Sequence, residues 1–262
     1  MAKSGSAVYV GSLGTVEMTA GTVKCDVKRN NAAVRLMGSK TGAANFTMTG
    51  GTAIADAGDG SETNVIAVWG TNAYSNLTIG DDSIVNGPVA VSAGSAITSI
   101  TGGTFTGTVT VKTGSITGGT FDTDVSSGLA DGLMLENGQI VPLTETGASA
   151  KIGDTLYLTF DRALVAAHGN DEIVLLKNVA LTKSYTIDKA ITLNLNTFEI
   201  VNSYAPTKDG FYSLTLKGAM TIKNGTYTAT GTHARGISAC NNLTLDGVTV
   251  NAAGLVGLSC ST

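Results

Sequence analysis

The heptapeptide SITGGTF occurs at residues 99–105 and again, unchanged, at residues 115–121, sixteen positions later. Each copy has the pattern of a short strand, a Gly-Gly turn and a second short strand. Identical phrases at this spacing indicate a repeat architecture in which one local structure is used on successive levels. We predict that the two copies lie one above the other, with the isoleucine and phenylalanine of each copy pointing inward. These side chains are Ile100, Phe105, Ile116 and Phe121.

Looser repeats surround this phrase. VEMTAGTVK at 16–24 aligns with FTMTGGTAI at 46–54, and MTIKNGTYTA at 220–229 aligns with LTLDGVTVNA at 243–252. Repeats of roughly sixteen to thirty residues, each with two or three short strands, are typical of the coils of a parallel β-helix. The sequence therefore predicts an all-β fold, a parallel β-helix solenoid. Because parallel crossovers are almost always right-handed, we expect right-handed winding.

The composition supports this class and excludes others. Glycine accounts for 34 of the 262 residues, aromatic residues for 5% and charged residues for 14%, so small and turn-forming residues replace those typical of helices. The net charge is −4 and no basic stripe is present, which argues against nucleic-acid binding. No apolar run approaches the roughly 20 residues of a membrane-spanning helix, so we expect no membrane span.

The repeats divide the chain into three parts. Residues 8–121 form a first β-helix stretch, 122–172 a linker and cap, and 173–262 a second stretch. The cap is predicted to hold a hairpin around Asn137-Gly138 and a short helix capped by Asp161 or Thr159 and ended by Gly169. The second stretch stops within a coil, so we expect it to be truncated. An uncapped coil would also allow self-association.

The cap and the segment after it carry a resemblance to a known family. AKIGDTLYLTFDRALVAAHGNDEIVLLKNVAL at 150–181 resembles the start of a β-helix module found in large surface proteins of gut Gram-positive bacteria. SITGGTFDTDVSSGLADG at 115–132 resembles the closing phrase of a preceding module. The resemblance covers roughly residues 97–262. It implies an extracellular protein at the bacterial cell surface, with a host or bacterial glycan or protein as its partner.

One acidic segment has the character of a metal site. Asp56, Asp59 and Glu62 surround glycines, and three carboxylates could bind calcium through oxygen ligands. The spacing lacks the rest of the EF-hand pattern, and a solvated loop between coils is the favoured interpretation. Calcium bound by these three residues is therefore the alternative cofactor prediction, and otherwise no cofactor is expected.

Other polar groups suggest structural roles more readily than catalysis. Asp81-Asp82 lies where a β-turn favours Asp, and Asp122 and Asp124 lie where Asp caps turns. His233 and Arg235 have no acidic partner nearby in sequence. Four asparagines that begin Asn-X-Thr are expected to bridge neighbouring coils through their amides. They are Asn45, Asn76, Asn224 and Asn242.

These observations favour a non-enzymatic, extracellular β-helix scaffold or adhesin-type segment of a bacterial surface protein. No catalytic residues are predicted. Two alternatives share the architecture and stay open: a polysaccharide-binding or polysaccharide-cleaving module, and a phage tail-fibre segment. An enzyme would need acidic and basic groups that converge on consecutive coils.

Overall fold

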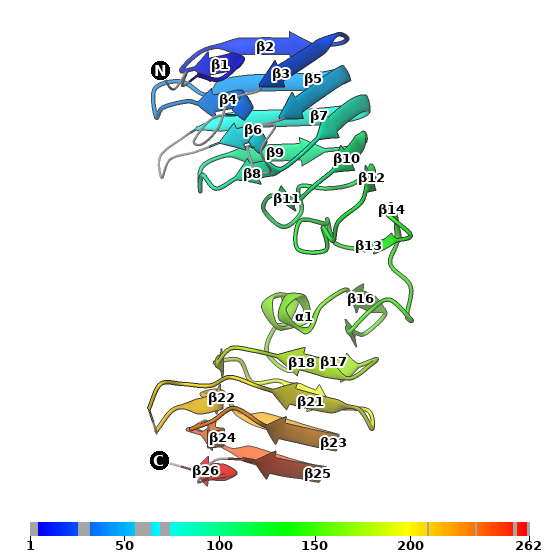
Figure 1. The fold of residues 1–262 in the computed structure, drawn as a ribbon. Helices are drawn as coiled ribbons and strands as arrows, with labels where there is room; N and C mark the ends of the chain where they lie inside the picture. The colour runs from blue at the N-terminus through cyan, green and yellow to red at the C-terminus, as the bar shows by residue number, and fades with distance from the viewer. Residues whose placement is uncertain are drawn as a thin grey trace. The chain divides into compact units, whose positions relative to one another are not determined.

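The computed structural model describes residues 5–25, 32–55, 64–68, 74–208, 210–233, 235–253 and 256–260. The chain divides into two compact units, Met1–Pro142 and Leu143–Thr262 (Figure 1). Strands dominate both units, and the described residues contain a single helix. The predicted all-β class is confirmed. The boundary between the units falls inside the segment 122–172.

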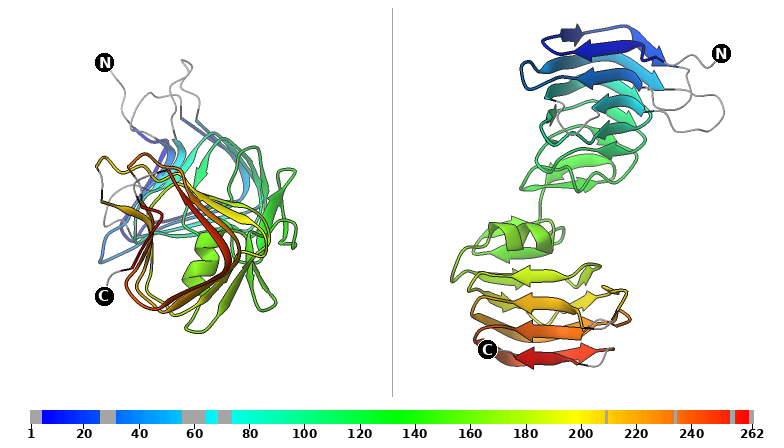
Figure 2. Two further views of the ribbon diagram at one scale, coloured as in Figure 1. Left: turned by 90° about the horizontal axis from the view of Figure 1, so that it is seen from below. Right: turned by 90° about the vertical axis from the view of Figure 1, so that its left-hand side faces the viewer.

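The first unit contains two sheets. The five-stranded sheet has the order β1 (Val8–Gly11), β4 (Ala32–Met37), β6 (Asn64–Val68), β8 (Val89–Val91), β11 (Val109–Thr110), all parallel. The strands of the nine-stranded sheet are β2 (Thr15–Met18), β3 (Thr22–Cys25), β5 (Ala44–Ala55), β7 (Ser75–Asn86), β9 (Ile97–Ile100), β10 (Thr104–Thr106), β12 (Thr120–Phe121), β13 (Leu133–Glu136) and β14 (Gln139–Pro142). Figure 2 shows the strands in successive layers.

The pairing register follows the sequence repeats. Val16 pairs with Phe46, as the alignment of the two nine-residue phrases predicts, and the strands run parallel. The two SITGGTF copies pair in the same way, with Phe105 opposite Phe121 in β10 and β12. An isolated parallel bridge joins Ile100 to Ile116. The prediction that equivalent residues lie one above the other is confirmed.

Inward side chains of this unit form continuous columns. One column connects six residues through parallel register, and each is at most 8% exposed. They are Met18, Met48, Ile79, Ile100, Ile116 and Leu129. A second column contains Phe105 and Phe121, whose rings stack with centroids 4.7 Å apart and planes inclined by 10°. The core of the unit is thus a set of repeated contacts between neighbouring levels.

The Gly-Gly pair of the repeated phrase is required at both positions. A Cβ atom on Gly118 would lie 2.1 Å from the backbone oxygen of Thr101, and one on Gly102 would lie 2.6 Å from the Cα atom of Asp81. The second glycine of each pair has a positive φ, 98° at Gly103 and 116° at Gly119. The first glycine therefore permits close stacking of levels, and the second permits the bend between strands.

A hairpin follows the last parallel strand of the first unit. Strands β13 and β14 pair antiparallel around Asn137 and Gly138, whose φ values of 49° and 79° match the positive φ values of a type I′ turn. Thr120 of β12 pairs with Gln139 of β14, so the hairpin covers the edge of the sheet. The predicted hairpin is confirmed.

The second unit also contains two sheets. Its eight-stranded sheet has the strands β15 (Ala150–Ile152), β16 (Thr155–Tyr157), β17 (Glu172–Leu175), β18 (Val179–Leu181), β20 (Thr192–Asn194), β21 (Glu199–Asn202), β23 (Met220–Ala229) and β25 (Leu243–Ala252). The four-stranded sheet has the order β19 (Tyr185–Ile187), β22 (Tyr212–Leu216), β24 (Arg235–Ala239), β26 (Leu258–Cys260). Met220 pairs with Leu243 and Ala229 with Ala252, as the alignment of residues 220–229 with 243–252 predicts.

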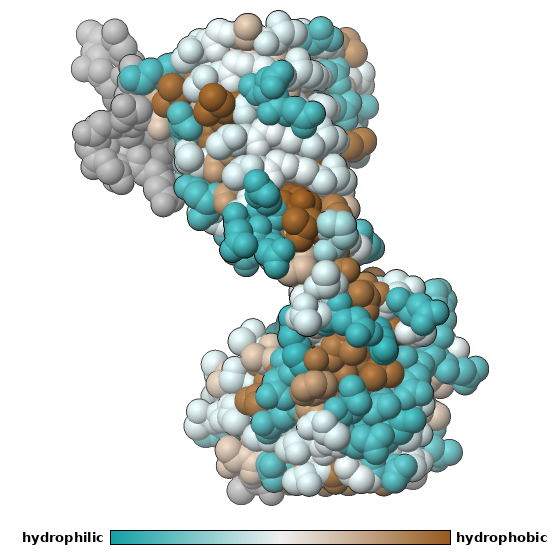
Figure 3. All heavy atoms as spheres, turned by 90° about the vertical axis from the view of Figure 1, so that its right-hand side faces the viewer, coloured by the Kyte–Doolittle hydropathy of each residue, from teal (hydrophilic) through white to brown (hydrophobic). Residues whose placement is uncertain are grey.

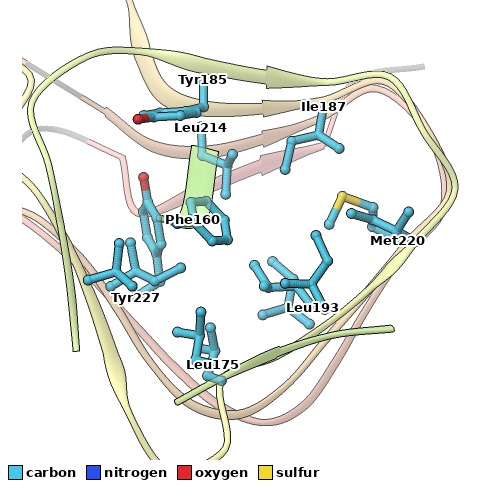
Figure 4. Close-up of a cluster of buried hydrophobic side chains, with 14 of the residues drawn as sticks. Phe160, Leu175, Tyr185, Ile187, Leu193, Leu214, Met220 and Tyr227 are labelled. Carbon is cyan, nitrogen blue, oxygen red and sulfur yellow. The ribbon is translucent and has the colours of Figure 1, made fainter. Parts of the chain in front are cut away.

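Helix α1 (Phe160–Ala166) packs against β15, β16 and β17. Of the two predicted caps, Thr159 is the one used, because its hydroxyl accepts a hydrogen bond from the backbone N–H of Arg162 at 3.3 Å. Phe160 points into the apolar cluster of the unit, near Tyr185 and Leu214 (Figure 4). The helix is thereby anchored at its N-terminus in the core of the second unit.

The predicted end of α1 at Gly169 is wrong, because the helix ends at Ala166. Lys189 donates hydrogen bonds from its Nζ to the carbonyl oxygens of Leu164 and Val165, each at 2.9 Å. These are carbonyls that a helix C-terminus leaves without an internal partner. A side chain from a later segment therefore caps the C-terminus of the helix, where the sequence predicted a glycine.

We predict that Gly118→Ala lowers the free energy of unfolding by about 1–3 kcal/mol or more, since the added methyl group meets backbone rather than a flexible side chain. Gly94→Ala is the matched control. A Cβ there meets nothing within 4 Å, so the change should be neutral or stabilising. Urea unfolding followed by circular dichroism measures both. Equal stabilities of the two variants would contradict the close stacking at Gly118.

Candidate functional site

The proposed calcium ligands Asp56, Asp59 and Glu62 lie outside the described residues. Within the part of the chain that the structure describes, no group of three or more His, Cys, Asp or Glu side chains could hold a metal ion. Calcium binding by the 56–62 segment thus stays a prediction from sequence.

The acidic pair Asp81-Asp82 lies in the middle of β7, so the predicted β-turn at this position is wrong. The strand continues through the pair, and its register with β5 shifts between Met48 and Gly50. Both carboxylates are exposed, although adjacent strand residues ordinarily face opposite sides. The irregularity places an extra residue in β7, which turns both side chains to solvent.

Asp122 and Asp124 hold the backbone of the last turns of the first unit. The backbone N–H of Gly107 donates to Asp122 Oδ1 at 2.8 Å. The hydroxyl and the backbone N–H of Ser126 both donate to Asp124 Oδ1, at 2.6 and 2.9 Å. These bonds, the hydroxyl's first, lower the pKa of Asp124. The predicted capping role is confirmed for Asp124, whereas Asp122 bonds the backbone of a preceding segment.

Arg235 contacts an aromatic residue on the neighbouring strand. Its register partner in β22 is Tyr212, and the guanidinium lies 5.5 Å from the centre of that ring. Arg235 Nη1 also donates to the Tyr212 hydroxyl at 3.4 Å. Hydrogen bonds from Ser259 and then Arg235 lower the pKa of Tyr212. This contact involves a residue 23 positions away, so only the strand register could have revealed it.

Asparagine side chains link neighbouring strands, as predicted. Asn76 Nδ2 donates to Asn45 Oδ1 at 2.7 Å in the first unit, and Asn224 Nδ2 donates to Asn194 Oδ1 at 3.2 Å in the second. The carboxamide of Asn242 makes no such bond with the described residues. Asn194, which does not begin an Asn-X-Thr sequence, connects this ladder to an acidic group.

That acidic group is Glu172, which accepts two hydrogen bonds. Asn194 Nδ2 lies 2.8 Å and Lys223 Nζ 3.1 Å from Glu172 Oε1. The bond from Asn194 and, second, the bond from Lys223 lower the pKa of Glu172. The cluster joins β17, β20 and β23 on their outward side and stabilises the charged form of the carboxylate.

A pocket of about 330 Å³ lies beside α1, between the helix and the segment that joins β18 to β19. Lys183 Nζ lies 3.3 Å from Asp161 Oδ2 and 5.0 Å from the centre of the Tyr185 ring. Burial, followed by the hydrogen bond to Asp161, raises the pKa of Tyr185. Asp161, Lys183 and Tyr185 interact with one another, and these contacts attach α1 to the following strands.

A groove of about 410 Å³ crosses the second unit where β20, β23 and β25 begin. Its hydroxyl groups come from Thr192, Thr221 and Thr244, which are register partners on these three strands. Asn170 and Asn242 also line the groove. No acidic or basic side chain lines it among the described residues. The groove is therefore a neutral, hydrogen-bonding surface built from equivalent positions of successive repeats.

The chain matches no known protein family, and comparisons with curated proteins and with solved structures found no relative. The structure shows an all-β protein that divides into two compact units. No helix among the described residues is long and apolar enough to cross a membrane.

We predict that the pKa of Glu172 lies below its ordinary value of 4.5 and rises both in Asn194→Ala and in Lys223→Ala. NMR titration of the carboxyl carbon measures it. A depressed folded-state pKa means that the stabilisation is present above pH 4.5 and is lost as the pH falls through the depressed value. A Glu172 pKa at or above 4.5 in the unmodified chain would contradict the cluster.

Proposed function

We propose that both units are right-handed parallel β-helices and that the chain is a non-enzymatic, extracellular scaffold segment of a bacterial surface protein. The observation that carries the proposal is the six-residue inward column from Met18 to Leu129, which runs through successive parallel strands. Such a column is what the stacked coils of a solenoid require. This architecture serves to hold other parts of a surface protein at a distance from the cell.

The stacking of side chains gives the chain the resistance to proteolysis that a surface scaffold needs. Each fully buried large apolar side chain contributes about 1.5–3 kcal/mol, and the columns place most of these side chains between two levels. Opening one level therefore disturbs both of its neighbours. A protease acts on strands only when they open, so continuous columns favour slow cleavage.

The resemblance of residues 97–262 to modules of gut bacterial surface proteins supports the extracellular location. The surface is consistent with a passive role. On the face shown in Figure 3, hydrophilic and near-neutral residues cover most of the area, and the hydrophobic areas are interrupted by hydrophilic ones.

We expect Phe105→Ala to destabilise the first unit by about 3–5 kcal/mol, because it removes half of a buried aromatic stack. Thermolysin cleavage within this unit should then accelerate at least 100-fold, as cleavage follows the population of the opened state. Thr104→Ala, at the exposed neighbouring position, should leave the rate unchanged. Rapid cleavage of the unmodified chain inside its paired strands would contradict the scaffold proposal.

A turnover assay separates the scaffold from the enzyme alternative. The native chain is incubated with acidic and neutral polysaccharides, with and without calcium, and unsaturated products and reducing ends are measured. The scaffold proposal predicts no turnover. Activity that disappears on replacing Asp81, Asp82 or Arg235 would overturn it in favour of a polysaccharide-cleaving enzyme.

A further inference from the structure

The neutral groove of the second unit has hydrogen-bonding groups that the protein does not use. Among the described residues, no hydrogen bond is made by the hydroxyls of Thr192, Thr221 and Thr244 or by the carboxamides of Asn170 and Asn242. Each hydroxyl can donate one hydrogen bond and accept two, and each carboxamide can donate two and accept two. Five polar side chains with free capacity therefore converge on one groove of about 410 Å³.

Backbone groups of β20 and β23 in the floor of the groove pair with the neighbouring levels on both sides, whereas β25 pairs only with β23. The N–H of Thr192 donates to Asp171 O at 2.9 Å, and that of Thr221 donates to Ile191 O at 3.2 Å. The N–H of Met220 donates to Asn242 O at 2.9 Å. An extended peptide that joins a sheet needs unpaired backbone groups at an edge. Over β20 and β23, which are paired on both sides, a ligand is recognised by the side chains.

The arrangement of these side chains is periodic. Parallel strands lie about 4.8 Å apart, so the three threonine hydroxyls repeat at that interval across β20, β23 and β25. The small side chains of Ala190 and Ala219 lie beside them in the groove and leave room above it. The groove thus offers a row of neutral donors and acceptors to a linear ligand that lies across the strands.

We propose that this groove binds a linear, neutral polysaccharide. Sugar hydroxyls both donate and accept hydrogen bonds, as threonine hydroxyls do, and a neutral sugar chain carries no charge that a partner would have to neutralise. A charged polysaccharide would be left without a counter-charge, since the lining contains no ionisable side chain among the described residues. This binding function is additional to the scaffold role and does not depend on it.

Affinity electrophoresis of the native chain tests the proposal. The chain, with a net charge of −4, is run through gels that contain glucomannan, arabinoxylan or mixed-linkage β-glucan. Parallel gels contain polygalacturonate or gelatin, as an acidic polysaccharide and a polypeptide. We expect retardation by at least one neutral polysaccharide and by neither of the others. No retardation by the neutral polysaccharides would overturn the proposal, as would retardation only by polygalacturonate or only by gelatin.

Variants locate the binding site. Thr221→Val keeps the shape of the side chain but removes one hydroxyl, so the dissociation constant should rise about fivefold. Replacing Thr192, Thr221 and Thr244 together by valine should abolish the retardation. Thr226→Val is the matched control, since it changes the same strand outside the groove and should leave the affinity unchanged.

The two single variants still test the proposal if the triple variant fails to fold. Should the triple variant lose its native circular dichroism spectrum, the comparison of Thr221→Val with Thr226→Val decides alone. Equal affinities of these two variants would overturn the assignment of the groove.

Discussion

The structure depends on one constraint, the parallel register between equivalent residues of neighbouring repeats. Parallel pairing sets each residue about 4.8 Å from its counterpart, so the environment of a side chain is largely set by the repeat before it. The Phe105 and Phe121 rings, 4.7 Å apart, show this spacing directly. The inward positions of the column from Met18 to Leu129 therefore hold apolar groups that stack on one another.

The same constraint governs the polar and the glycine positions. Asn76 on Asn45 and Asn224 on Asn194 each place an amide donor against an amide acceptor one level away. Each bond contributes about 1 kcal/mol to the free energy of unfolding, so the ladders stabilise the fold appreciably only when such bonds are repeated. Gly118 is the opposite case, because the preceding level leaves no space for even a methyl group. The fixed spacing between levels thus explains why asparagines stack on one another and why position 118 holds a glycine.

Much of this could be predicted from sequence, because repeats encode register. The alignment of residues 16–24 with 46–54 predicts the pairing of β2 and β3 with β5, and the Asn137-Gly138 pair predicts the hairpin. The irregularity at Asp81-Asp82 could not be predicted, since an extra residue in one strand has no local signature. The end of α1 was also hidden, because it depends on Lys189, far along the chain.

The surface contacts were harder to foresee than the fold. The Arg235–Tyr212 contact and the threonine groove join residues that only the register brings together, and none of them carries a motif by itself. The threonines at 192, 221 and 244 are ordinary strand residues in the sequence. Their shared position across three strands brings them into one groove, and this becomes visible only once the pairing is known.

The measurement that tests the central claim most directly is a methyl–methyl NOE experiment on the intact chain with labelled isoleucine and leucine methyl groups. The column predicts cross-peaks from Ile79 to Ile100, from Ile100 to Ile116 and from Ile116 to Leu129. Single Ile→Val replacements assign the signals. Strong cross-peaks between these neighbours, and none between Ile79 and Leu129, are the expected result. Absence of the Ile100–Ile116 cross-peak would contradict the in-register stacking on which the account depends.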